Sequence, residues 1–148
     1  MLMPGSGARE KRDTQRAMSH ENVEIVQATI DALNRGDVEA VIADAAPDFE
    51  FDFSRSIGPR RGVFGLDEVR EFWDYFAGTF ESVRIEPHEF IDAGEYVIVP
   101  WTAHMVGRDG IQVQARTTWT WTIREGAVVR LCMYQERAEA LEAAGLSE

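Results

Sequence analysis

Apolar residues recur at helical spacing in three segments of the chain. The first predicts a helix over about residues 21–35, which Gly36 ends. A short helix follows, capped by Asp37, and a third helix is predicted over about residues 66–80. The apolar stripe of the third helix consists of Leu66, Val69, Trp73, Phe76 and Phe80.

Strict alternation of apolar and polar residues begins at Phe49 and predicts a strand over residues 49–53, with Glu50 and Asp52 opposite the three Phe. After the third helix, turn signals separate further strands, and a short helix over residues 136–144 closes the chain. These strands are predicted at about residues 82–91, 96–106, 111–124 and 128–135. The order α-α-β-α-β-β-β-β-α, with helices first and an antiparallel meander last, predicts an α+β fold.

The chain has 148 residues and a net charge of −11, which suits one acidic domain. Residues 1–17 are locally basic and lack apolar periodicity, so we predict a disordered tail ahead of a single domain over 18–148. The basic residues could also dock on an acidic partner. A body this acidic disfavours nucleic acid and an anionic membrane surface. One cysteine, Cys132, and no long apolar run favour the cytoplasm.

Three local patterns resemble one known family. They are the segment Gly58–Gly65 followed by Val69–Trp73, the hairpin Trp119–Arg130, and the closing segment Tyr134–Leu146. In this order they resemble the SnoaL-like, ketosteroid isomerase-like family of the nuclear-transport-factor-two-like superfamily, over about residues 20–146. The resemblance implies a curved, mostly antiparallel sheet wrapped over three helices, a cone with an internal pocket. The superfamily holds isomerases, cyclases, dehydratases, epoxide hydrolases and non-enzymatic binders.

Asp52 is the first candidate catalytic residue, because ketosteroid isomerase-like members carry a general base near the end of the first strand. A carboxylate in an apolar cavity has a raised pKa, which suits proton abstraction next to a carbonyl. Alternation alone does not say which strand face borders the cavity, so Asp52 could equally face solvent.

His104 and Tyr134 are the other candidate catalytic residues. His104 could shuttle protons near neutral pH, and Tyr134 could donate a hydrogen bond to an enolate oxygen. Each could instead be a structural residue with a local hydrogen-bond partner.

Large aromatic side chains are the candidate ligand-binding residues, because they suit a flat apolar molecule. They are Trp73, Phe76, Trp101, Trp119 and Trp121. Plain core packing is the alternative. His20, His88 and His104 lack metal-ligand spacing and no phosphate-binding glycine loop is present, so we predict neither metal nor cofactor.

The resemblance therefore implies a small-molecule pocket, and a cofactor-independent isomerase or cyclase that acts on an apolar cyclic or polyketide-like substrate. The alternative is a non-catalytic ligand-binding or dimerisation module of the same fold. We also expect a homodimer, since the long sheet has apolar residues on more than one face.

Overall fold

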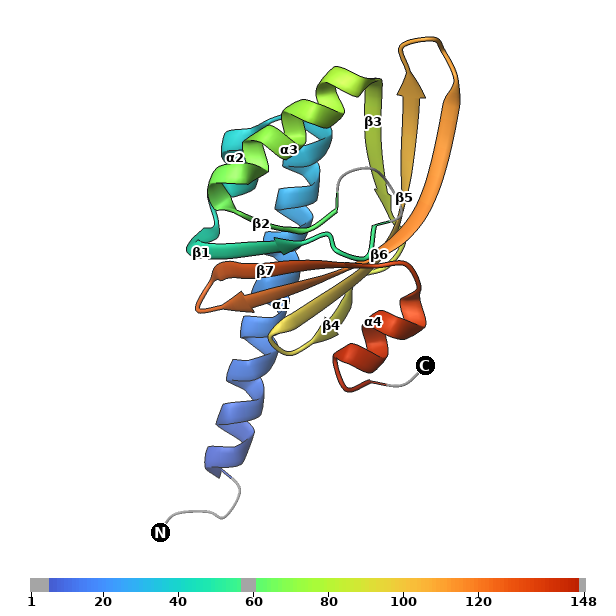
Figure 1. Cartoon of the computed structure of the whole chain (residues 1–148). Helices are drawn as coiled ribbons and strands as arrows, with labels where there is room; N and C mark the ends of the chain where they lie inside the picture. The colour runs from blue at the N-terminus through green and yellow to red at the C-terminus, as the bar shows by residue number, and fades with distance from the viewer. Residues whose placement is uncertain (1–5, 57–60, 147–148) are drawn as a thin grey trace.

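The computed structural model describes residues 6–56 and 61–146, with side chains from residue 20 on. In this part of the chain, a curved, open sheet of seven strands packs with four helices (Figure 1). The strands are β1 (Ala45–Asp52), β2 (Val63–Gly65), β3 (Phe80–Pro87), β4 (Ile91–Ala93), β5 (Tyr96–Gly107), β6 (Gln112–Arg124) and β7 (Ala127–Tyr134). Their order is β2-β1-β7-β6-β5-β3, and β4 also pairs with β5. Only β1 and β7 pair in parallel among these strands. The predicted α+β class is confirmed.

The helices are α1 (Ser6–Arg35), α2 (Val38–Ile42), α3 (Leu66–Thr79) and α4 (Arg137–Ala143). Asp37 caps α2 as predicted, because its carboxylate accepts from the backbone N–H of Ala40 at 3.1 Å. The start of α1 differs from the prediction. Residues 6–17, expected to be disordered, continue this helix, while residues 1–5 lie outside the described part. Ala, Arg, Glu, Lys and Gln dominate residues 8–17 and favour helix without any apolar stripe.

The predicted strand over residues 82–91 is two strands in the structure. Pro87 ends β3 because it has no N–H to continue the ladder, and the N–H of His88 instead donates to the carbonyl of Pro100 at 2.9 Å. The chain then re-enters the sheet as β4, against the start of β5.

The two faces of the sheet bury different clusters. We call the face under α1, α2 and α3 the inner face, and the opposite one, which α4 covers in part, the outer face (Figure 1). The inner cluster includes Val97, Val99, Trp119 and Trp121 of the sheet, Val26 and Ile30 of α1, and Phe72 of α3. The outer cluster is smaller and joins Ile98, Cys132 and Tyr134 to Ala140 and Leu141 of α4. Strand alternation therefore separates one large apolar core from a second environment behind the sheet.

Candidate functional site

An apolar cavity of about 90 Å³ lies between the inner face and helices α1, α2 and α3. We call it the inner cavity. Aliphatic side chains of the three helices line one side, and strands β1, β6 and β7 supply the other. Its aromatic lining consists of Phe49, Phe51, Phe72, Trp73, Trp119 and Trp121.

The lining contains almost no polar chemistry. None of the described residues around the inner cavity has an ionisable side chain. Thr29 contributes a hydroxyl, which donates to the carbonyl of Ile25 at 2.9 Å. A charged ligand would therefore be buried without a counter-charge, which is costly. An apolar ligand would gain free energy by leaving water for this wall.

Three buried tryptophans provide hydrogen-bond donors without acceptors. Trp101, Trp119 and Trp121 are 8%, 6% and 2% exposed, and no acceptor in the described part of the chain receives their indole N–H groups. The ring centroids of Trp101 and Trp119 are 4.1 Å apart, and those of Trp119 and Trp121 are 5.6 Å apart at 85°. Trp119 and Trp121 line the inner cavity.

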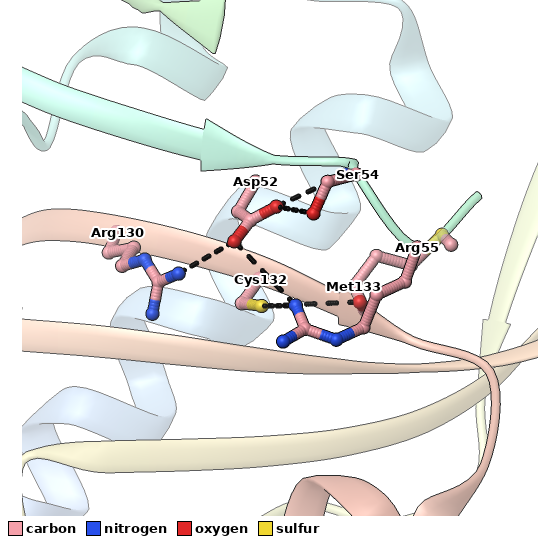
Figure 2. Close-up of polar contacts among 6 residues, drawn as sticks. All are labelled: Asp52, Ser54, Arg55, Arg130, Cys132 and Met133. Carbon is pink, nitrogen blue, oxygen red and sulfur yellow. Dashed lines mark hydrogen bonds and ion pairs between the residues drawn. The ribbon is translucent and has the colours of Figure 1, made fainter. Parts of the chain in front are cut away.

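Asp52 lies away from this cavity. In β1 its side chain is on the face opposite Phe49 and Phe51, and the parallel pairing of β1 with β7 places it beside Cys132 (Figure 2). Its carboxylate accepts from the Ser54 N–H at 3.1 Å and from the Ser54 hydroxyl at 2.5 Å. The same carboxylate pairs with Arg130 at 2.7 Å and with Arg55 at 3.6 Å.

These partners decide the charge state of Asp52. Burial raises the pKa of this carboxyl, but the hydrogen bonds from Ser54 and the positive charges of Arg130 and Arg55 outweigh burial, so the pKa lies below its ordinary value. The expectation of a raised pKa in an apolar cavity is therefore wrong. A carboxylate held ionised by two arginines is a weak proton acceptor near neutral pH.

Tyr134 lies on the same face of the sheet as Asp52, in the outer cluster. The Arg55 guanidinium lies 4.6 Å from the centre of the Tyr134 ring and donates to the Cys132 sulfur at 3.3 Å. Burial raises the pKa of Tyr134, and a hydrogen bond with the Cys132 thiol raises it further. Burial also raises the pKa of Cys132. Both groups stay protonated, and neither lines the inner cavity.

His104 lies apart from both residues, on β5, which is separated from β1 by β7 and β6 in the sheet order. Its Nε2 is 3.0 Å from Glu86 Oε1, and its Nδ1 is 3.1 Å from the amide nitrogen of Gln114. The hydrogen bond with His104 lowers the pKa of Glu86. The structure therefore brings Asp52 and Tyr134 together through Arg55 and leaves His104 elsewhere.

The candidate ligand-binding residues divide into two groups. Trp73, Trp119 and Trp121 line the inner cavity. Phe76 and Trp101 do not: Phe76 packs against Phe72 at 5.0 Å between ring centroids, and Trp101 packs against Trp119. Phe49, Phe51 and Phe72 also line the cavity, which the sequence did not predict. The shared strand face of Phe49 and Phe51 was visible in the sequence, but the packing of that face against Phe72 of α3 was not.

Two further findings concern metal binding and membrane insertion in the described part of the chain. They contain no group of three or more His, Cys, Asp or Glu side chains that could hold a metal ion. None of the helices in this part of the chain is long and apolar enough to cross a membrane.

Comparisons with known proteins agree with this architecture. No curated protein matches the chain. Among solved structures, TerC co-crystallised with polyporic acid is 23% identical, with a TM-score of 0.71 over 84% of this chain and 98% of TerC. An NTF2-like protein of unknown function from Burkholderia pseudomallei is 26% identical, with a TM-score of 0.70 over 82% of this chain and 95% of that protein.

A third structure comes from Catenulispora acidiphila. It is a hypothetical protein with a ketosteroid isomerase-like fold in complex with trimethylamine, 17% identical, with a TM-score of 0.66 over 83% of this chain and 93% of that one. The family model for the SnoaL-like domain matches residues 26–131, a range that includes every residue around the inner cavity. The chain therefore belongs to the SnoaL-like domain family.

Proposed function

We propose that this chain binds a small, predominantly apolar molecule in the inner cavity. The observation that carries the proposal is the lining itself, aromatic and aliphatic, without an ionisable side chain among the described residues. Burial of apolar ligand surface contributes about 25 cal/mol per Å², so shape and apolar area supply the affinity. Two proteins of this fold, TerC and the Catenulispora protein, are seen with small molecules in their crystals.

The size of the cavity limits the ligand. An apolar protein cavity of about 150 Å³ accepts benzene, whereas the inner cavity measures about 90 Å³. Even a single five- or six-membered ring therefore requires the cavity walls to move outward slightly, and a larger ligand requires a larger movement of α2 or of the Trp73 side chain. Since α2 has only five residues and none is buried, it is the wall that moves most easily.

Membership of the SnoaL-like family also favours cofactor-independent isomerase or cyclase chemistry, but the described lining offers no group to carry it. Proton abstraction inside the cavity requires a proton acceptor on its wall, and the described lining has no carboxylate, imidazole or phenol. Asp52 and Tyr134 are held behind the sheet, beside Arg55. Binding without turnover is therefore the function that we propose.

A cavity-filling substitution tests the binding proposal. Val69 lines the cavity from α3, so Val69→Phe should fill much of it and weaken binding of small apolar probes by at least about tenfold. The matched control is Val63→Phe on β2, because Val63 is 55% exposed and does not line the cavity. The probes are benzene, methylenecyclopentane and cyclopentanone, followed by NMR titration and by the shift in melting temperature.

The outcomes separate clearly. Binding to the wild type and to Val63→Phe, with loss in Val69→Phe, supports the proposal. Absence of binding to the wild type at millimolar concentrations, or undiminished binding to Val69→Phe, would contradict it. If Val69→Phe does not fold, Ala45→Leu provides a smaller filling substitution from the sheet side.

A further inference from the structure

We propose that the ion pair between Glu39 and Arg70 is a latch, which holds α2 closed over the inner cavity and limits how fast ligands enter and leave. Glu39 lies on α2 and Arg70 on α3, and both helices line the cavity. This inference rests on the proposed binding function and concerns the regulation of the same site.

The exposure of the lining residues indicates where a ligand enters. The lining residues of β6 and β7 are all buried. On α2 and α3, the half-buried lining residues are Val38, Val41, Ile42, Leu66, Val69 and Trp73. The wall that these two neighbouring helices form therefore has solvent on its far side, so a ligand reaches the cavity by parting α2 from α3 (Figure 1).

Helix α2 is tied to the backbone around it only near its ends. Before the helix, the Asp37 N–H donates to the Ala32 carbonyl at 3.0 Å, and after it, the Val128 N–H donates to the Asp44 carbonyl at 2.8 Å. Gly36, with a φ of 72°, joins α1 to this segment. Because α2 has five residues and none is buried, little apolar contact holds it down between these ties.

The Glu39–Arg70 pair supplies a contact across the opening. No second ion pair joins α2 to α3 in the described part of the chain. The Arg70 guanidinium donates to the Glu39 carboxylate, and this hydrogen bond lowers the pKa of Glu39, so both groups are charged at neutral pH. The Glu39 and Arg70 side chains are 71% and 51% exposed, so water screens the pair and the stabilisation is small. A weak contact of this kind lets α2 open without unfolding the domain.

Removal of one charge tests the latch. Arg70→Gln should raise the association and dissociation rates of benzene about twofold to fivefold, the effect of one exposed ion pair. The dissociation constant should change less than about twofold, because the pair forms in both the empty and the occupied closed states. NMR exchange measurements give both rates. Raising NaCl from about 20 mM to about 500 mM should speed exchange in the wild type but not in Arg70→Gln.

The matched control is Arg124→Gln. Arg124 pairs with Glu95 at 3.4 Å, their side chains are 63% and 44% exposed, and neither residue lines the cavity. This variant removes the same charge from a similar ion pair and should leave both benzene rates unchanged. Arg70→Lys, which keeps the positive charge, should stay close to the wild-type rates.

Amide hydrogen exchange gives a readout that needs no ligand. The Val41 N–H donates to the Asp37 carbonyl at 3.1 Å, so it exchanges when α2 opens. Arg70→Gln should speed its exchange about twofold to fivefold, and Arg124→Gln should not. Because Arg70 is remote in sequence from Val41, the substitution leaves the intrinsic exchange rate of this amide unaltered.

Failure of the latch differs from failure of the binding proposal. If benzene binds, but neither its rates nor the exchange of Val41 differ between Arg70→Gln and the wild type, the latch is overturned and apolar binding stands. Equal acceleration in Arg124→Gln would also overturn the latch, because the effect would not depend on the contact between α2 and α3. If benzene does not bind the wild type, the binding proposal fails, and the latch fails with it as a control of ligand exchange.

Discussion

Asp52 ties three parts of the chain together behind the sheet. Its carboxylate holds Ser54 of the following loop, Arg55 of the same loop and Arg130 of β7 (Figure 2). The Asp52 side chain is 10% exposed, while those of Arg55 and Arg130 are 42% and 44% exposed, so the arginines keep contact with water. This arrangement stabilises an ionised carboxylate and anchors the loop that leaves β1.

Asp52→Asn should lower the free energy of unfolding by about 1–3 kcal/mol at pH 7, because charge-assisted hydrogen bonds contribute more than neutral ones. The matched control is Asp48→Asn on the same strand, where the side chain is exposed. Urea unfolding monitored by circular dichroism measures both variants. Equal free energies of unfolding for Asp52→Asn and the wild type would show that the ion pairs of Asp52 do not stabilise the fold.

The pH dependence of this difference follows from the lowered pKa of Asp52. A carboxyl whose pKa is lower in the folded state binds its proton more readily when unfolded. It therefore stabilises the fold above about pH 4, and this contribution fades as the pH falls toward the folded-state pKa. The gap in stability between the wild type and Asp52→Asn should be constant from about pH 6 to about pH 7 and shrink below about pH 4. A gap that widens on acidification would contradict the lowered pKa.

Single residues also show what a strand's alternation leaves undecided. The alternation around Phe49 and Phe51 correctly placed Asp52 on the opposite strand face, but it did not say which face borders the cavity. That depends on the parallel pairing of Asp52 with Cys132, which lies far along the chain, and on α4 covering the outer face. Trp119 and Trp121 were easier to assign, because both lie two residues apart on β6 and so share one face of the sheet.

At the scale of elements, long alternating strands and glycine turns were predictable. The hairpin of β6 and β7 turns at Gly126, whose φ of 78° suits glycine, and the hairpin of β5 and β6 turns at Gly110 with a φ of 86°. The strands β2 and β4 were missed, because three residues carry too little alternation to be seen. The early start of α1 was missed because propensity, not an apolar stripe, extends it.

Helix α4 contributes the second core, and its packing against the sheet is testable. Leu141 is 4% exposed and packs in the outer cluster, so Leu141→Ala should lower the free energy of unfolding by about 2–4 kcal/mol. Leu146 is 39% exposed, and Leu146→Ala should cost less than about 1 kcal/mol. Similar costs for the two variants, measured by urea unfolding, would mean that α4 does not pack as described.

At the scale of the whole molecule, the sheet separates two environments. Its inner face borders the apolar cavity. Its outer face carries Asp52 with its partners Arg55 and Arg130, and it packs against α4. The SnoaL-like match over residues 26–131 contains the whole described cavity lining and also Asp52, Arg55 and Arg130, but not Tyr134 or α4.

Homodimer formation is a prediction at this scale. Ile111 and Val113 are 62% and 42% exposed near the end of the β5–β6 hairpin, apolar surface that a second copy could cover. We expect light scattering to give twice the chain mass of 16.7 kDa at micromolar concentration. Since each copy carries a net charge of −11, salt should screen the repulsion and raise the dimer fraction between about 20 mM and about 500 mM NaCl.

Two matched substitutions locate the interface. Val113→Asp should shift the protein toward monomer, because it places a charge where the dimer would bury apolar area. Val63→Asp, at a 55% exposed site on β2, adds the same charge away from the hairpin and should leave the mass unchanged. An equal effect of both variants would mean that net charge alone controls association. A monomer in the wild type at every salt concentration would exclude the dimer.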